Sequence, residues 1–384
     1  MQVYLDNSAT TRPCDESVQA MLCCMRDGFY NPSALYAPAM HAEHELGLAR
    51  QAVANALDAN EKNVIFTSCG TESDNLAIFG LLQGQRGEGE ILYSQAEHAA
   101  VRNACAEAGE RFGFEPRLIP LTGEGSLDLD ALEGMLNART RLICAMQICN
   151  ETGVCMPIAE VCALRDRLAP QAAIFVDGVQ GFLRQPFSLR RLNVQAYALS
   201  GHKIHGPKGV GALVLRDGVR VHPQLMGGGQ QNNLRSGTEN TAGIAGLRAA
   251  VEHYPKGAEQ TMRALKRELV RMLTAALPQA VVIGLAADDP MSAGHILSIA
   301  FPPVRAETLL HALEADGILV GTGSACSSHK GKRSVVLSAM RQPPQNMDGA
   351  IRLSLCPSNT AEEIRYTAEK IIAAVTVLRR FTRR

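Results

Sequence analysis

Short apolar runs alternate with segments of helical periodicity along the first half of the chain. The runs are typical of buried strands, and the apolar positions spaced three or four apart that follow them are typical of amphipathic helices. The predicted strands are Asn63–Ser68, Ile91–Ser94, Arg117–Pro120, Leu142–Ile148 and Ala173–Asp177. The predicted helices after them are Glu72–Leu82, Ala99–Gly109, Leu129–Leu136 and Ile158–Leu168. Continuous apolar strands interleaved with helices indicate a parallel sheet covered on both faces.

A different pattern begins after the predicted helix Thr241–His253, at the break Pro255–Gly257. Helices and strands here are mixed without regular alternation, which predicts a smaller α+β unit. Its predicted helices are Gln260–Leu277, Glu307–Asp316 and Ala361–Phe381, and its predicted strands are Val281–Ile283, Leu297–Phe301 and Ile351–Leu355.

Composition is that of an ordinary globular enzyme. The 384 residues are enough for two domains. The 38 basic and 38 acidic residues balance, so charge favours neither nucleic acid nor a membrane surface as a partner. No apolar run approaches the roughly 20 residues of a membrane span, and the first residues do not resemble an export signal. We therefore expect a cytoplasmic protein.

The eleven cysteines are scattered and odd in number. None forms a Cys-x-x-Cys pair, and Cys144, Cys149, Cys155 and Cys162 lack the spacing of zinc ligands. Reduced thiols, several of them buried as small hydrophobic residues, are a better interpretation than a metal site. We predict no bound metal.

Lys203 lies in Ser200–Gly209, just after the apolar stretch Ala196–Leu199, and Asp177 ends the preceding predicted strand. A lysine among small and hydrogen-bonding residues at a strand end is suited to form a Schiff base. An aspartate at the next strand end can pair with a pyridinium nitrogen. Pyridoxal 5′-phosphate needs that pair, because its ring withdraws electrons best when the nitrogen stays protonated.

Two segments are candidates for binding the cofactor's phosphate. Thr67–Glu72 joins a strand to a helix start, where Gly70 and Thr71 would offer free N–H groups and a hydroxyl. A simple helix cap at Thr71 explains this motif equally well. Ser200 and His202, which flank Lys203, would add donors. The glycine-rich run from Gly227 to Thr238 is a weaker candidate, because such loops often serve only as turns.

Three further polar residues follow successive predicted strands. His98 could stack on an aromatic cofactor and transfer protons, although a lone histidine is more often structural. Asn150 follows the strand Leu142–Ile148, and Gln180 could donate to the cofactor's phenolate oxygen. Each signal is weak alone, but their shared placement at strand ends indicates one ligand-binding edge.

A reactive cysteine and a buried arginine complete the set. Cys326 lies in Gly321–Arg333, where glycines, serines and basic residues are typical of an exposed loop. The basic neighbours favour the thiolate, so we interpret Cys326 as a nucleophile, although an incidental surface thiol is the alternative. Arg352 stands between apolar residues in Ile351–Leu355 and needs an anionic partner, such as a substrate carboxylate.

These motifs together resemble a cysteine desulfurase of the NifS/IscS type, among the class V aminotransferase-like, fold-type I pyridoxal phosphate enzymes. The resemblance covers nearly the whole chain and runs in family order. The matching motifs are Tyr4–Thr11, Thr71–Asn75, Glu97-His98, Asn150–Gly153, Asp177–Gln180, Ser200–Lys203, Arg235–Thr238 and Gly323–Cys326.

The resemblance implies the α/β fold of type I pyridoxal phosphate transferases. A mostly parallel seven-stranded sheet flanked by helices would form a large domain of residues 12–256. Residues 1–11 and 257–384 would form a small domain that carries the catalytic cysteine loop.

The resemblance also implies a role for each candidate residue. Lys203 would hold the cofactor, with Asp177 on the pyridine nitrogen, His98 on the ring, and Gln180 and Asn150 near the ring oxygen and the substrate. The implied phosphate ligands are Gly70, Thr71, Ser200, His202 and, from the neighbouring subunit of a homodimer, Thr238.

Arg352 would bind the carboxylate of L-cysteine, and Cys326 would take its sulfur as a persulfide while L-alanine leaves. The sulfur acceptor would be an iron–sulfur scaffold or a tRNA-thiolation protein, and the Cys326 persulfide could ligate an iron–sulfur cluster transiently.

Some positions depart from the family pattern. Cys69 and Gly70 stand where a Gly-Ala pair is common, Lys330–Arg333 is unusually basic, and the chain ends soon after its last predicted helix. These departures put docking to a scaffold in question. Three other functions remain open: a selenocysteine lyase, a class V aminotransferase that would not need Cys326, and a non-catalytic sulfur carrier, which Lys203 and Asp177 argue against.

Overall fold

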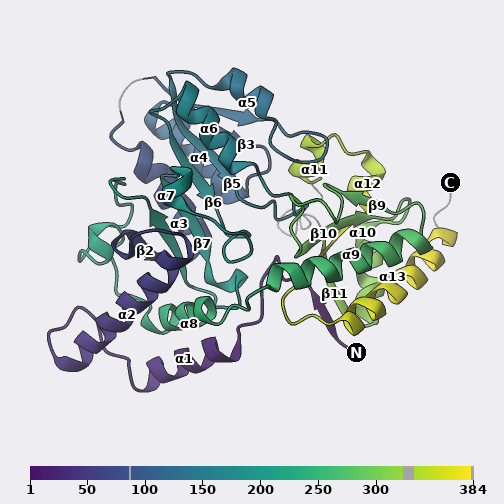
Figure 1. The fold of residues 1–384 in the computed structure, drawn as a ribbon, viewed down its shortest axis with the longest axis horizontal. Helices are drawn as coiled ribbons and strands as arrows, with labels where there is room; N and C mark the ends of the chain where they lie inside the picture. Colours follow the sequence, from purple (N-terminus) through teal and green to yellow (C-terminus); the bar gives the residue numbers. More distant parts are fainter. Residues whose placement is uncertain (86–87, 323–332, 382–384) are drawn as a thin grey trace.

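Two β-sheets, each with helices against it, organise the chain (Figure 1). The computed structural model describes residues 1–85, 88–322 and 333–381. One sheet has seven strands and the other five, and the helices α9 and α13 lie on the side of the smaller sheet.

The larger sheet has the order β2-β8-β7-β6-β5-β3-β4. All neighbouring strands are parallel except β8, which runs antiparallel to both β2 and β7. The parallel sheet predicted from the sequence pattern, and the mostly parallel seven-stranded arrangement implied by the family resemblance, are therefore confirmed. Its strands are β2 (Val64–Thr67), β3 (Glu90–Ser94), β4 (Glu115–Ile119), β5 (Thr140–Met146), β6 (Ala173–Asp177), β7 (Ala196–Ser200) and β8 (Gly211–Leu215).

The central strands are buried on both faces, as β6 illustrates. Ile174 and Val176 belong to one hydrophobic cluster, whereas Phe175 belongs to the cluster on the other face. Alternate side chains of a strand point to opposite faces, and burial of each such side chain contributes about 1.5–3 kcal/mol. This double burial explains why the strand is continuously apolar. It also leaves the strand ends as the place for polar residues.

Helices cover both faces of the larger sheet. The most enclosed is α3, which contacts α4 and several strands and is buried along most of its length. The helices on this side are α1 (Asp15–Arg26), α2 (Ala37–Ala56), α3 (Gly70–Leu82), α4 (Ala99–Phe112), α5 (Leu129–Met135), α6 (Ile158–Leu168), α7 (Leu189–Leu192) and α8 (Thr241–Glu252). No helix within the described ranges is long and apolar enough to cross a bilayer.

The smaller sheet has the order β1-β11-β12-β10-β9. Its first strand comes from the start of the chain and pairs in parallel with β11, so the N-terminus lies beside this sheet (Figure 1). The strands are β1 (Val3–Leu5), β9 (Val281–Ile283), β10 (Ile296–Ala300), β11 (Ile318–Thr322) and β12 (Ala350–Ser354). The helices are α9 (Ala258–Ala276), α10 (Ala306–Ala315), α11 (Val335–Ala339), α12 (Pro344–Gly349) and α13 (Ala361–Phe381).

The structure corrects several boundaries predicted from the sequence. Helix α3 begins at Gly70, two residues before the predicted start, and Cys69 rather than Thr71 is its N-cap residue. Strand β4 begins at Glu115 rather than Arg117. The sequence pattern also missed β1, β8 and β11 and the helices α1, α2, α11 and α12. Strand β1 pairs with β11, and α1 packs against α8, both far along the chain, so local periodicity does not reveal these elements.

Candidate active site

Polar side chains from both sheets line one cavity of about 370 Å³. It lies at the carboxyl ends of β3, β5, β6 and β7, where open α/β sheets bind ligands, and next to the start of α3. Residues from the segment after β1 and from β12 close it on the other side. The structure brings ten of the predicted site residues together here: Gly70, Thr71, His98, Asn150, Asp177, Gln180, Ser200, His202, Lys203 and Arg352.

Lys203 is the last residue of a short 3-10 turn, Gly201–Lys203, that follows β7 directly. Its Nζ donates hydrogen bonds to the carbonyl oxygens of Ser8 (2.5 Å) and Ala9 (2.8 Å). Both acceptors belong to the segment that follows β1. The amine is therefore held between the two sheets at the edge of the cavity.

The pKa of Lys203 is lowered to about 8. Burial is the main cause, because it penalises the charged form. The cations Arg352 and Arg184 lower this pKa further, and Asp177 and Asp6 oppose them. Roughly one-tenth of such an amine is uncharged at pH 7, so Lys203 can act as a nucleophile and a base near neutral pH.

Asp177 ends β6 and is buried. Its Oδ1 accepts a hydrogen bond from the backbone N–H of Val179 (2.9 Å). Burial raises the pKa of this carboxyl, and the N–H of Val179, His98 and Lys203 act in the opposite direction. A cationic ring nitrogen next to Asp177 would favour its ionised form.

The start of α3 forms another wall of the cavity. A Cβ built on Gly70 would lie 2.8 Å from Cγ2 of Val179, so the approach of these two elements requires glycine. The first N–H groups of a helix have no intrahelical partner and attract anions. Ser200 adds a buried hydroxyl with no hydrogen-bond partner among the described residues. These groups form an anion-binding end.

His202 and His98 are both neutral near pH 7 in this environment. Burial, assisted by Lys203 and Lys208, lowers the pKa of His202 to about 4. Burial also lowers the pKa of His98, against the attraction of Asp177.

The tautomer of His98 follows from its position as the N-cap residue of α4. Its Nδ1 accepts a hydrogen bond from the N–H of Ala100 (3.2 Å). A neutral ring that accepts at Nδ1 carries its proton on Nε2.

Arg352 extends from β12 into the cavity and is only 3% exposed. Its Nη1 donates to the carbonyl oxygen of Asn150 (3.0 Å), and its Nη2 pairs with Oδ1 of Asp6 (2.8 Å). A guanidinium has five N–H donors, and Nε has no partner within the described part of the chain. Donors therefore remain for an anionic ligand in the cavity.

Three buried carboxyl groups line the cavity that sequence reasoning had not singled out: Asp74, Glu97 and Glu151. Burial raises the pKa of Asp74 and Glu97 well above the usual range, and each is raised further by Asp177. Glu97 accepts a hydrogen bond from the N–H of Met146 (2.6 Å). All three lie within motifs noted in the sequence (Thr71–Asn75, Glu97-His98 and Asn150–Gly153), but nothing in those motifs distinguishes a buried acid from an exposed one.

Glu151 contacts the segment between β11 and β12, just before α11. Its Oε2 accepts a hydrogen bond from the hydroxyl of Ser334 (2.6 Å), and burial raises its pKa to about 7. Gly321, on β11, lies opposite Arg352 in the sheet. The described residues on both sides of 323–332 are thus anchored at the cavity.

Two predicted site residues are not placed in the cavity. Thr238 is exposed and does not line it. Cys326 lies outside the described residues.

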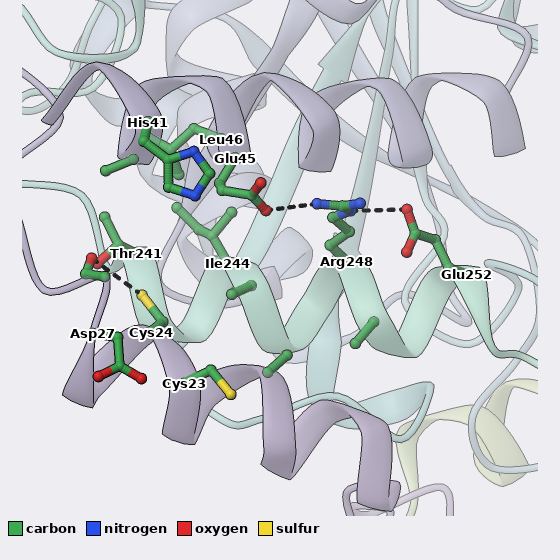
Figure 2. Close-up of a pocket in the computed structure, with 15 residues that line it drawn as sticks. Cys23, Cys24, Asp27, His41, Glu45, Leu46, Thr241, Ile244, Arg248 and Glu252 are labelled. Carbon is green, nitrogen blue, oxygen red and sulfur yellow. Dashed lines mark hydrogen bonds and ion pairs between the residues drawn. The ribbon is translucent and has the colours of Figure 1, made fainter. Parts of the chain in front are cut away.

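A second cavity, of about 380 Å³, lies between α1, α2 and α8 (Figure 2). Arg248 crosses it and pairs with Glu45 (2.7 Å) and Glu252 (2.8 Å). None of the predicted site residues lines this cavity. No lysine of the described chain lines it, so it has no pair of residues equivalent to Lys203 and Asp177.

Comparison with known families matches the aminotransferase class-V model over residues 3–366. A cysteine desulfurase of Trichormus azollae is 38% identical over 382 residues, which cover 98% of this chain and 94% of that protein. The cysteine desulfurase NifS of Azotobacter vinelandii is 37% identical over 383 residues, which cover 98% of this chain and 93% of that protein.

Solved structures of similar proteins show the same similarity along nearly the whole chain. A NifS-like protein superimposes with a TM-score of 0.91 at 33% identity, and the match covers 98% of this chain and all of that one. SspA, solved in complex with cysteine, has a TM-score of 0.81 at 27% identity, with 94% of this chain and 100% of that chain covered.

Proposed function

The chain belongs to the aminotransferase class V family and, within it, to the cysteine desulfurases, and we propose that it takes sulfur from L-cysteine. The products are L-alanine and a persulfide on Cys326. One observation carries the proposal: the amine of Lys203 and the carboxyl of Asp177 line one cavity with an anion-binding end and a buried arginine. Enzymes of this family depend on pyridoxal phosphate.

The residues of the cavity fit this cofactor. The buried, unpartnered hydroxyl of Ser200 and the start of α3 at Gly70 suit its phosphate. Thr71 and His202 line the same end. When bound, pyridoxal phosphate supplies an electron sink for bonds at the substrate Cα.

Asp177 is the buried anion for the ring nitrogen, and Lys203 is the amine for the covalent attachment. Gln180 lines the cavity with them, and its side-chain N–H donates to the carbonyl oxygen of Ser8 (3.0 Å). A second donor N–H of this amide remains for the cofactor's ring oxygen.

Substrate binding falls to Arg352 and Asn150. The unused donors of Arg352 bind the carboxylate of L-cysteine, and the hydrogen bond from Arg352 to the carbonyl oxygen of Asn150 fixes the guanidinium plane. Lys203 Nζ, with its pKa lowered to about 8, accepts the Cα proton. His98, with its proton on Nε2, can donate to the reacting groups.

The sulfur-transfer step is assigned to Cys326. Its thiolate attacks the substrate sulfur, a new S–S bond forms, and the bond between that sulfur and Cβ breaks. The electron pair of the broken bond stays with Cβ, which takes up a proton as alanine forms. The anchoring of Gly321 beside Arg352 and of Ser334 on Glu151 supports this assignment, because Cys326 lies between these two points in the chain.

The protein acts as a homodimer and passes its sulfur to a separate acceptor protein. Thr238 is exposed and outside the cavity, which is consistent with a phosphate contact made across a dimer interface. Large apolar side chains are exposed around α1 and the start of α2: Met25 (60%), Phe29 (66%), Leu35 (95%) and Met40 (65%). Their burial against a second copy would stabilise a homodimer. Sedimentation equilibrium tests this, and a monomer that binds the cofactor fully would contradict it.

The acceptor is an iron–sulfur scaffold or a tRNA-thiolation protein. The first option is supported by the similarity to proteins named NifS. A selenocysteine lyase would use the same cavity, and the ratio of turnover with selenocysteine to turnover with cysteine separates the two activities.

The decisive experiment follows alanine release and the mass of the protein after incubation with L-cysteine. Wild type should release alanine and gain one sulfur on Cys326. Cys326→Ala should bind the cofactor but lose both results. Cys23→Ser, at an exposed cysteine that does not line the cavity, is the matched control and should behave as wild type. Equal alanine release by Cys326→Ala would refute the desulfurase reaction and favour an aminotransferase.

A further inference from the structure

A buried arginine lies behind the cavity without an acidic partner. Arg184, in the turn after β6, is 4% exposed. Its Nη1 donates to the carbonyl oxygen (3.1 Å) and to Oε1 (3.0 Å) of Gln180, and its Nη2 donates to the carbonyl oxygen of Lys203 (2.5 Å). All three acceptors are neutral, and no salt bridge to Arg184 occurs within residues 1–85, 88–322 and 333–381.

The hydrogen bonds of Arg184 belong to a closed ring. The side-chain N–H of Gln180 donates to the carbonyl oxygen of Ser8 (3.0 Å), and Nζ of Lys203 donates to the same oxygen (2.5 Å). Because a guanidinium can only donate, Oε1 of Gln180 must face Arg184. The amide nitrogen therefore faces Ser8 and the cavity.

The charges around Lys203 are otherwise paired. Six charged or titratable residues interact electrostatically with the amine of Lys203. They are Arg352 on β12, Asp6 after β1, Asp177 on β6, His98 before α4, the neighbouring His202, and Arg184. Asp6 pairs with Arg352, and in the proposed function Asp177 is committed to the cofactor. Both histidines are neutral near pH 7. Arg184 is thus the cation that remains uncompensated among these groups.

An uncompensated buried cation is costly to folding by several kcal/mol. A neutral residue could make hydrogen bonds to the same carbonyl oxygens without that cost. We therefore expect the effect of this charge in the amine and the amide beside it.

We propose that Arg184 is a positioning residue, which turns the Gln180 amide so that its N–H groups face the cofactor and holds a positive charge behind Lys203 through the Lys203 carbonyl oxygen. This inference rests on the proposed function, since it concerns the same cavity. It adds a residue that does not line the cavity and acts only through Gln180 and Lys203. The lowered pKa of Lys203 agrees with it.

The test is the rate at which cofactor-free protein takes up pyridoxal phosphate, followed by absorbance as a function of pH. Only the uncharged amine of Lys203 attaches the cofactor, so the rate reports its protonation. If removal of the charge in Arg184→Met raises the Lys203 pKa by one unit, the uncharged fraction at pH 7 falls about tenfold. Uptake at pH 7 should slow about tenfold, and the two proteins should converge above about pH 10.

Two further variants separate charge from shape. Arg184→Lys keeps the charge and should restore the wild-type pH dependence, which a purely structural role would not require. Arg165→Met is the control for loss of a buried arginine, because Arg165 is also buried but pairs with Asp166 and binds Ala172, Asn193 and Gln195 away from the cavity. It should lower stability and leave the pH dependence of uptake unchanged.

The effect through Gln180 is tested by a double-mutant cycle on kcat. Arg184→Met should lower kcat less in a Gln180→Ala background than in wild type, because both changes remove the same oriented donor. Fully additive losses would refute this part of the proposal.

The outcomes separate a failure of the role of Arg184 from a failure of the proposed function. If wild type takes up no pyridoxal phosphate, the proposed function fails. If wild type takes it up and a folded Arg184→Met has the wild-type pH dependence, the role of Arg184 is refuted. Should Arg184→Met not fold by circular dichroism, Arg184→Gln replaces it, and the same wild-type dependence would refute the inference.

Discussion

The assignment of Arg352 to the substrate carboxylate leads to a quantitative prediction for Arg352→Met. Two of the five guanidinium N–H groups are used by Asn150 and Asp6, so three remain for a ligand. A bidentate carboxylate uses two charge-assisted hydrogen bonds, each worth about 1.5 kcal/mol. Their loss, about 3 kcal/mol, corresponds to a decrease of more than 100-fold in kcat/KM for L-cysteine.

The assay compares L-cysteine with cysteamine, which has the same thiol and amine but no carboxylate. The kcat/KM of wild type should be more than 100-fold higher for L-cysteine than for cysteamine. In Arg352→Met the two values should be similar, because cysteamine has no carboxylate for the arginine to bind. Arg352→Lys keeps the charge but cannot form two parallel hydrogen bonds to a carboxylate. Its kcat/KM for L-cysteine should therefore fall about tenfold. The circular dichroism spectrum and the amount of pyridoxal phosphate bound at saturation serve as the folding controls. An unchanged preference in a variant that binds the cofactor would refute the role of Arg352.

Two further changes test the architecture of the site. A Cβ at Gly178 would lie 1.8 Å from Cζ of the buried Tyr197, so Gly178→Ala should lower the free energy of unfolding by about 3 kcal/mol. In urea titration, Gly134→Ala, where a Cβ has open space, is the control and should be neutral or slightly stabilising. Glu151 has its pKa raised from 4.5 to about 7 by burial, so between these pH values the unfolded chain releases a proton that the folded protein retains. Stability should therefore fall by about 3 kcal/mol as pH rises through this window. Glu151→Gln should remove that part of the pH dependence, and an identical slope in the two proteins would contradict the assignment.

The larger sheet was largely predictable because its central strands are buried on both faces. Such strands are continuously apolar, as in Ala173–Asp177, and this pattern is visible without any knowledge of neighbours. Strand β8 is as apolar and as buried, yet it was missed, because it follows the glycine-rich turn after Lys203 without an intervening helix. Strand β1, of three residues, depends on pairing with β11 more than 300 positions away. No local pattern carries that information.

The candidate site divides in the same way. Residues that follow apolar strands, such as Asp177 and Lys203, were predictable because chain position alone puts them at the carboxyl edge of the sheet. The carboxyl groups of Asp74 and Glu151 were not, because a buried acid in the sequence looks like an exposed one. Arg184 was missed for a similar reason: its acceptors are backbone and amide oxygens, which every sequence contains.

The sequence by itself determined the chemistry available to this protein: a lysine and an aspartate at successive strand ends, a glycine-bearing turn for an anion, and a distant cysteine. These features follow from residue type and spacing, and they are local. Only the tertiary structure decided how that chemistry is tuned. Burial together with Arg352 and Arg184 lowers the pKa of Lys203, and Asp6, from the other end of the chain, pairs with Arg352. Electrostatic effects depend on distance and on access to water, and both are set by the folded chain rather than by the order of its residues.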